Sequence, residues 1–187
     1  LSDSKKDMTA SKPDTVVSNQ IRQIHPSMPE YLFKVYGRAD SQNHGSTFNT
    51  DKIEIYNAVN NGKLIQEIQI KEAQTWDGRT LGVEFEDMNF DGYLDFRVQA
   101  LIPAGPNIPY LYWLWDPKSA SYISNTNLEE ITSPVFDAKN QTIQSNIRES
   151  AASYSDNTYK YINGKPVIVK RIERKADADK KVWHITI

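Results

Sequence analysis

Apolar and polar residues alternate along Ile53-Glu-Ile-Tyr-Asn-Ala-Val59 and again along Leu64-Ile-Gln-Glu-Ile-Gln-Ile70. This period of two is typical of β-strands that bury one face. The segment between them, Asn60-Asn-Gly-Lys63, is a turn signal, because Asn and Gly accept the backbone angles of a tight hairpin. The whole stretch therefore predicts a β-hairpin.

The rest of the chain carries further short β-prone runs. They lie at residues 31–36, 81–86, 95–101, 110–115, 142–148, 159–162, 167–172 and 182–187. About ten short strands joined by short turns indicate an all-β fold of mostly antiparallel sheets, packed as a β-sandwich or as propeller-like blades. The alternation leaves both packings open, and it predicts no helix longer than two turns. We expect residues 31–187 to form a single domain.

Residues 1–30 have a different composition, rich in Ser, Asp, Lys and Thr and with little apolar periodicity. Segments of this kind do not bury enough apolar surface to fold alone. We expect a flexible N-terminal linker, which suits either a tether to an export signal or lipid anchor or an ordinary frayed terminus.

The composition excludes several classes of function. The 187 residues include 22 Lys and Arg against 24 Asp and Glu, and the formal net charge of −2 predicts neither nucleic acid nor an anionic membrane as a partner. There is no cysteine, so thiol catalysis, thiolate zinc sites and disulfides are excluded. No apolar run approaches the roughly 18 residues that a membrane-spanning helix needs, so we expect no transmembrane segment.

The acidic loop Asp87-Met-Asn-Phe-Asp-Gly-Tyr-Leu-Asp95 has the pattern of a calcium-binding loop. Oxygen-bearing side chains occupy loop positions 1, 3, 5 and 9, and glycine stands at position 6, where such a loop turns sharply. Because alternate residues point the same way, the oxygens should converge while Met88 and Phe90 face away. The predicted Ca²⁺ ligands are the side chains of Asp87, Asn89, Asp91 and Asp95 and the backbone carbonyl of Tyr93.

The acidic loop differs from a full EF-hand in two ways. Position 12 is Val98, so the bidentate Glu is missing, and the flanking residues have the pattern of strands rather than helices. A metal-free turn is the alternative, since Asp, Asn and Gly also form β-turns without a metal. We expect Ca²⁺ to have a structural role, because no nearby acid and base form a catalytic set.

Residues 147–155, Ile-Arg-Glu-Ser-Ala-Ala-Ser-Tyr-Ser, interrupt the strand pattern with small and hydroxyl-bearing side chains. Small residues allow a loop to enter a narrow cleft, and Arg148 can bind carboxylates there. The hydroxyls of Ser150, Ser153 and Tyr154 can donate hydrogen bonds to the same groups. An ordinary polar loop is the alternative.

The run at residues 110–115, Tyr-Leu-Tyr-Trp-Leu-Trp, is a second candidate surface, since carbohydrate-binding proteins stack sugars on rows of aromatic rings. Alternate residues of a strand face opposite ways, and we expect core packing to explain at least one of the two faces. The three histidines are isolated and no Gly-x-Ser-x-Gly segment is present, so no catalytic constellation is evident. We therefore expect a binding protein rather than an enzyme.

Three segments together resemble a family of exported bacterial proteins. They are Glu86-Asp-Met-Asn-Phe-Asp-Gly-Tyr-Leu-Asp-Phe96, Tyr112-Trp-Leu-Trp-Asp-Pro117 and Ser133-Pro-Val-Phe-Asp137, and the likeness continues through Tyr159-Lys-Tyr-Ile-Asn-Gly-Lys165. The family is related to the periplasmic inhibitors of invertebrate-type lysozyme and includes immunity proteins against peptidoglycan-hydrolase toxins. The resemblance covers residues 80–172 and is loose over the N-terminal part of the chain.

In those inhibitors, a loop of the pattern Ser-Gly-x-x-Tyr plugs the active-site cleft of the lysozyme. Ser150-Ala-Ala-Ser-Tyr154 has the same spacing, with Ala151 where the family has Gly, a change that restricts the backbone. The resemblance implies an exported protein, in the periplasm or at the cell surface, that inhibits a lysozyme-like peptidoglycan hydrolase. Its target-binding loop would comprise Arg148, Ser150, Ser153 and Tyr154. The alternative is a surface glycan- or protein-binding module without inhibitory activity.

Overall fold

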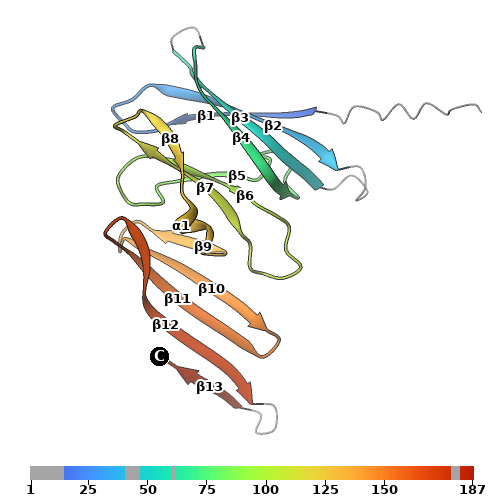
Figure 1. Cartoon of the computed structure of the whole chain (residues 1–187), viewed down its shortest axis with the longest axis vertical. Helices are drawn as coiled ribbons and strands as arrows, with labels where there is room; N and C mark the ends of the chain where they lie inside the picture. Colours follow the sequence, from blue (N-terminus) through green and yellow to red (C-terminus); the bar gives the residue numbers. More distant parts are fainter. Residues whose placement is uncertain (1–14, 41–46, 60–61, 178–181) are drawn as a thin grey trace, which may run out of the picture.

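The computed structural model describes residues 15–40, 47–59, 62–177 and 182–187. Within these ranges the chain forms three antiparallel β-sheets stacked one on another and a short helix, α1 (Thr126–Glu129) (Figure 1). The all-β, antiparallel fold predicted from the sequence is confirmed, and the stack is sandwich-like. No helix in these ranges is long and apolar enough to cross a membrane.

The N-terminal sheet is a four-stranded meander in the order β1-β2-β3-β4. Its strands are β1 (Thr15–Gln23), β2 (Glu30–Asp40), β3 (Thr47–Asn57) and β4 (Leu64–Thr75). The predicted hairpin at residues 53–70 is the β3–β4 pair, in which Ile53 lies opposite Ile68. In its turn, residues 60 and 61 lie outside the described part of the chain.

Strand β1 corrects the predicted linker, because it occupies residues 15–23 of the range 1–30 and pairs with β2 along its whole length. Its inward-facing positions include Ser18 and Gln20, which are buried but polar. A strand with polar side chains on its inner face shows no apolar alternation in the sequence. The folded domain therefore begins before residue 31, and residues 1–14 lie outside the described ranges.

The central sheet, in the order β5-β6-β7-β8, is covered on both faces. Its strands are β5 (Val83–Glu86), β6 (Asp95–Gln99), β7 (Tyr110–Asp116) and β8 (Ser121–Ser124). One face, which includes Phe96 and Trp113, packs against the N-terminal sheet in a first core. The other face, which includes Tyr112, belongs to a second core together with the C-terminal sheet.

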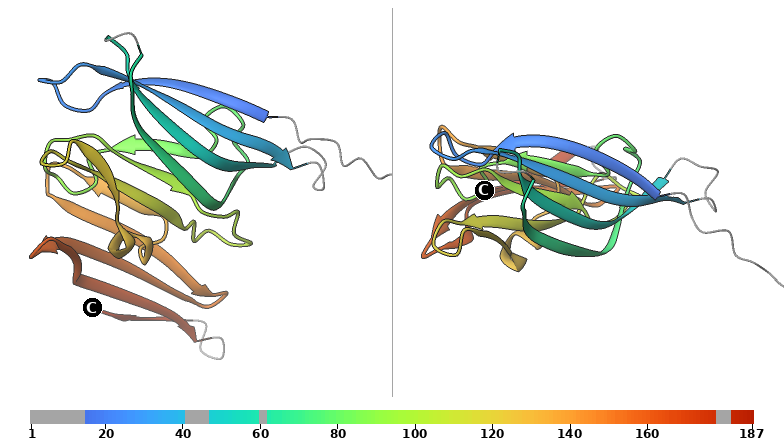
Figure 2. Two further views of the ribbon diagram at one scale, coloured as in Figure 1. Left: turned by 45° about the horizontal axis from the view of Figure 1, so that its top comes forward. Right: turned by 90° about the horizontal axis from the view of Figure 1, so that it is seen from above.

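The C-terminal sheet has five strands in the order β13-β12-β11-β10-β9. They are β9 (Pro134–Asp137), β10 (Thr142–Ser150), β11 (Ser153–Ile162), β12 (Lys165–Asp177) and β13 (Val182–Thr186). Its inner face contributes Phe136, Ile143 and Tyr159 to the second core. Its outer face is turned away from the other two sheets (Figures 1 and 2).

Candidate functional site

The acidic loop connects β5 and β6 of the central sheet. Oδ1 of Asp87 and Oδ1 of Asn89 both accept a hydrogen bond from the backbone N–H of Asp91, at 3.1 and 3.2 Å. Oδ2 of Asp87 accepts from the N–H of Gly92 at 2.9 Å, and Oδ1 of Asp91 accepts from the N–H of Tyr93 at 3.0 Å. Asp87, Asn89 and Asp91 therefore direct their oxygens into one small loop.

Met88 and Phe90 of the acidic loop point into the second core. Met88 is fully buried, and Phe90 meets the rings of Phe136 and Tyr161 edge-on at 6.4 and 6.2 Å between centroids. Phe90 has a positive φ of 63°, which is rare for a residue with a side chain. Packing against the C-terminal sheet therefore helps to hold the loop in its conformation.

Asp95 ends the acidic loop and is turned into the protein interior. Its carboxyl group is fully buried and accepts hydrogen bonds from the backbone N–H groups of Met88 and Trp115, each at 2.8 Å. Burial raises the pKa of Asp95 to about 7, although the two amide hydrogen bonds act in the opposite direction. Asp95 thus joins the loop to β7, a contact that the loop pattern alone does not indicate.

The oxygens of the acidic loop are of the type that a hard cation such as Ca²⁺ prefers. A carboxylate oxygen that accepts one backbone hydrogen bond keeps a lone pair for a metal. Asp87, Asp91 and Asp95 form no ion pair with residues in the described ranges. However, no three His, Cys, Asp or Glu side chains there lie close enough together to hold a metal ion. Asn89, the carbonyl of Tyr93 and water would therefore have to complete a site.

The predicted binding loop is the end of a long β-hairpin. Strands β10 and β11 pair as far as Ser150 and Ser153, so that Ala151 and Ala152 form the turn. Residues 148–152 are exposed, and the hairpin ends at one edge of the stack (Figure 2). The segment predicted as a loop is thus mostly strand, because its β10 residues pair with β11, and Ser153, Tyr154 and Ser155 pair with both β10 and β12.

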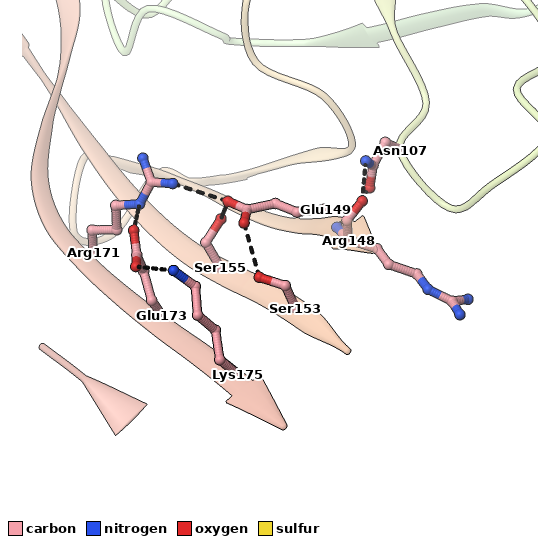
Figure 3. Close-up of polar contacts among 8 residues, drawn as sticks. All are labelled: Asn107, Arg148, Glu149, Ser153, Ser155, Arg171, Glu173 and Lys175. Carbon is pink, nitrogen blue, oxygen red and sulfur yellow. Dashed lines mark hydrogen bonds and ion pairs between the residues drawn. The ribbon is translucent and has the colours of Figure 1, made fainter. Parts of the chain in front are cut away.

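Arg148 is held by its backbone and keeps its guanidinium exposed. Its N–H donates to Oδ1 of Asn107, and Nδ2 of Asn107 donates to its carbonyl, both at 2.9 Å. The guanidinium lies 5.8 Å from the ring centre of Tyr154, and its Nε donates to the carbonyl of Ser150 at 3.2 Å. The side chain points away from Glu149 (Figure 3) and forms no ion pair within the described ranges. It is therefore available to a carboxylate of a partner.

Glu149, which sequence reasoning missed, organises the opposite side of the hairpin (Figure 3). Its carboxylate accepts hydrogen bonds from Oγ of Ser153 at 2.9 Å and from Nη2 of Arg171 at 3.0 Å. Arg171 also pairs with Glu173 at 3.0 Å, and Glu173 lies 3.6 Å from the ammonium of Lys175. The hydrogen bond from Ser153, together with the charge of Arg171, lowers the pKa of Glu149. No local pattern indicates this cluster, because Arg171 lies 22 residues from Glu149 in the sequence.

The structure brings together only part of the predicted target-binding set. Arg148 and Tyr154 are cross-strand neighbours on one face of the hairpin. Ser153 faces the Glu149 cluster on the other side, while Ser150 flanks the turn and accepts the N–H of Ala152 on its Oγ at 3.1 Å. Ser153 is therefore better placed to support the hairpin than to contact a partner.

The aromatic run at residues 110–115 forms β7 and is divided between the two cores. Trp113 and Trp115 are buried against the N-terminal sheet, and Tyr110 and Tyr112 are buried toward the C-terminal sheet. These four rings are 0–9% exposed, so they cannot stack on a sugar. The expectation that core packing explains these aromatics holds for both faces.

No protein-family model matches the sequence, and a search of curated proteins found no match. A solved structure does share the fold. It is described as a Xanthomonas Type IV secretion system related protein, and it aligns with a TM-score of 0.63 over 91% of this chain and 92% of its own, at 15% sequence identity. At that identity the likeness concerns the fold and carries no function by itself.

Proposed function

We propose that the protein is an exported, calcium-binding inhibitor of a lysozyme-like peptidoglycan hydrolase, and that it is not itself an enzyme. The observation that carries the proposal is the exposed end of the β10–β11 hairpin, where Arg148 and Tyr154 lie side by side next to a small turn. Its sequence resembles the cleft-plugging loop of the lysozyme inhibitors. The bonds to Asn107 and within the Glu149 cluster support this role, because a segment that is already ordered loses less entropy on binding.

The chemistry of such a target suits the hairpin. A glycan-cleaving site holds two carboxyl groups, one of them an acid with a raised pKa. In this proposal the guanidinium of Arg148 binds one of these groups through charge-assisted hydrogen bonds, and the hydroxyl of Ser150 binds the other. Tyr154 adds apolar contact area at the mouth of the cleft. The hairpin would then exclude the glycan substrate without any reaction of its own.

The structural neighbour is described as related to a secretion system, and this supports an exported location in the periplasm or at the cell surface. The alternative of a glycan-binding module loses its main support, because the aromatic side chains on which it depended are buried. The exposed end of the β10–β11 hairpin, residues 148–152, is the feature that favours the inhibitor instead.

Inhibition can be measured on the turbidity of a peptidoglycan suspension. Added in slight excess over an invertebrate-type lysozyme, the protein is expected to slow the clearing of the suspension. Arg148→Ala should raise the inhibition constant at least about tenfold, because it leaves a buried carboxylate of the target unpaired. Lys63→Ala removes a positive charge from the exposed β3–β4 turn and should inhibit like the parent. If neither this lysozyme nor a panel of exported bacterial peptidoglycan hydrolases is slowed, the proposed function is wrong.

We further propose that the acidic loop binds Ca²⁺ through Asp87, Asn89, Asp91, Asp95 and the carbonyl of Tyr93. When bound, the cation would neutralise carboxylates that otherwise repel one another. Its role would be structural, because the loop is joined through Asp95 to β7 and packs on the sheet that carries the hairpin.

Ca²⁺ is expected to raise the melting temperature, because a ligand that binds only the folded state stabilises it by mass action. With a dissociation constant on the order of 1 mM, as in extracellular modules, about 10 mM free Ca²⁺ stabilises by about 1.4 kcal/mol. For a chain of this size the rise over a sample in EDTA is about 3–6 °C. Asp91→Ala removes a ligand from the middle of the loop and should lose most of the rise. An equal rise in this variant would contradict the site.

A further inference from the structure

The outer face of the C-terminal sheet is hollowed next to the hairpin. Two adjoining hollows, of about 540 and 390 Å³, share Asn146. Around Asn146 the side chains on this face of the five strands are Tyr154, Arg174, Ile185, Val135, Gln144, Asp156, Thr158, Lys170 and Ile172. Together the two hollows form the outer groove.

Strand register arranges the outer groove in rows that cross the strands. The row nearest the turn is Tyr154, Arg174 and Ile185, and Arg148 extends it beyond the two hollows. The next row is Asn146, Asp156 and Ile172, and the third is Val135, Gln144, Thr158 and Lys170. Directly opposed residues of antiparallel strands have Cβ atoms about 4.5–5.5 Å apart, so each row is a continuous strip of side chains. A chain molecule lying across the strands would contact one whole row.

The outer groove carries an excess of positive charge, whereas the whole chain has a net charge of −2. Its cationic side chains are Lys170 and Arg174, its carboxylate is that of Asp156, and Arg148 borders it as the cross-strand neighbour of Tyr154. This carboxylate is already engaged, because Arg174 and Asn146 both donate hydrogen bonds to it. Arg148 and Lys170 form no ion pair within the described ranges. Two cations therefore remain to attract an anionic ligand.

Apolar side chains lie between these charges. Val135 and Ile185 are 64% and 61% exposed, and Ile172 and Tyr154 are half-buried. The solvated face of an antiparallel sheet normally carries polar side chains, and apolar side chains gathered on an exposed face mark a binding surface. The ligand should therefore carry apolar groups as well as negative charge.

We propose that the outer groove binds an extended acidic segment of a protein partner, in which carboxylates alternate with aliphatic side chains. The inference rests on the proposed function, because Tyr154 lines the groove, Arg148 borders it, and both lie at the end of the hairpin. The segment would then belong to the hydrolase and lie beside its cleft. A glycan fits the groove less well, because sugars stack on rows of aromatic rings and Tyr154 is the one aromatic among the described groove residues. The guanidinium of Arg148 also lies 5.8 Å from the centre of that ring.

The groove can be tested without the hydrolase. The isotope-labelled full chain is titrated with the synthetic peptide acetyl-Glu-Val-Glu-Leu-Glu-amide and followed by NMR. Saturable shifts are expected at the backbone amides of Gln144, Thr158, Lys170 and Ile185, which lie on different strands. Lys170→Glu should weaken the affinity about fivefold, because an exposed attraction becomes a repulsion. Lys63→Glu, the same reversal on the β3–β4 turn, should leave the affinity unchanged.

Two further ligands test whether the groove selects acidic peptides. The same peptide with Lys in place of Glu should not bind, and a neutral chito-oligosaccharide should not displace the acidic peptide. Absence of saturable shifts, shifts confined to other parts of the molecule, or binding of the oligosaccharide at the same amides would each overturn the inference.

The experiment also separates this inference from the proposed function. Inhibition of a hydrolase without any peptide shifts at the groove would overturn the groove alone. Peptide binding at the groove together with failure to inhibit every hydrolase tested would overturn the proposed function alone, and the partner would be another acidic protein.

Discussion

Replacing Asp95 by alanine is expected to lower the free energy of unfolding by about 2–4 kcal/mol. The substitution leaves the buried N–H groups of Met88 and Trp115 without an acceptor. Each orphaned donor costs about 1–3 kcal/mol. An opposing gain exists, because alanine also removes a buried acid. That gain is largest above the raised pKa of about 7 and becomes small only near pH 4, about the ordinary pKa of an aspartate, where the unfolded chain also binds the proton.

Urea denaturation near pH 4 (about the ordinary pKa of an aspartate) in a Ca²⁺-free buffer measures this change without a contribution from Ca²⁺. Asp91→Ala is the matched control, because Asp91 is exposed and its carboxylate accepts hydrogen bonds within the loop. The free energy of unfolding of Asp91→Ala should fall by less than about 1 kcal/mol. Asp95→Asn keeps one acceptor oxygen, so its loss of unfolding free energy should lie between the losses of the two alanine variants. Equal losses for the two alanine variants would show that the buried carboxyl group does not connect the loop to β7.

Alternation in the sequence predicted the strands where one face is apolar and the other polar. The β3–β4 hairpin is such a case, with Ile53 and Ile55 buried in the first core. Alternation did not predict strand β1, because its inward-facing side chains at Ser18 and Gln20 are polar. It also left the packing of the sheets open. The unbroken apolar run at residues 110–115 indicates which sheet is central, because a strand that is apolar on both faces has to lie between two other layers.

The acidic loop could be located from the sequence because its oxygens come from neighbouring residues. The hairpin could not be specified to the same degree, because its supports Asn107 and Arg171 are distant in the sequence. The register along whole strands, rather than the composition of the turn, determines which side chains share a face. The spacing of the loop pattern places Ser153 and Tyr154 in one binding set, although successive residues of a strand face opposite ways.

Tyr154→Ala is expected to weaken binding to the hydrolase about 30-fold, or roughly 2 kcal/mol, as for a tyrosine at a binding hot spot. Tyr154 lies beside Arg148 on the outer face of the hairpin, half-buried and outside both cores. Its truncation should therefore cost only about 1 kcal/mol of folding free energy. Inhibition of peptidoglycan clearing and the melting temperature are measured on the same preparation.

Tyr159→Ala is the matched control, because it is the same change on the same strand but on the inner face. Tyr159 is 8% exposed and belongs to the second core, so its truncation should cost about 3–5 kcal/mol. A Tyr154→Ala protein that melts and inhibits like the parent would remove Tyr154 from the binding surface. One that loses as much stability as Tyr159→Ala would make Tyr154 a packing residue, and its loss of inhibition would then follow from unfolding. Weak inhibition by a well-folded Tyr154→Ala protein is the result that the exposed pair of Arg148 and Tyr154 predicts.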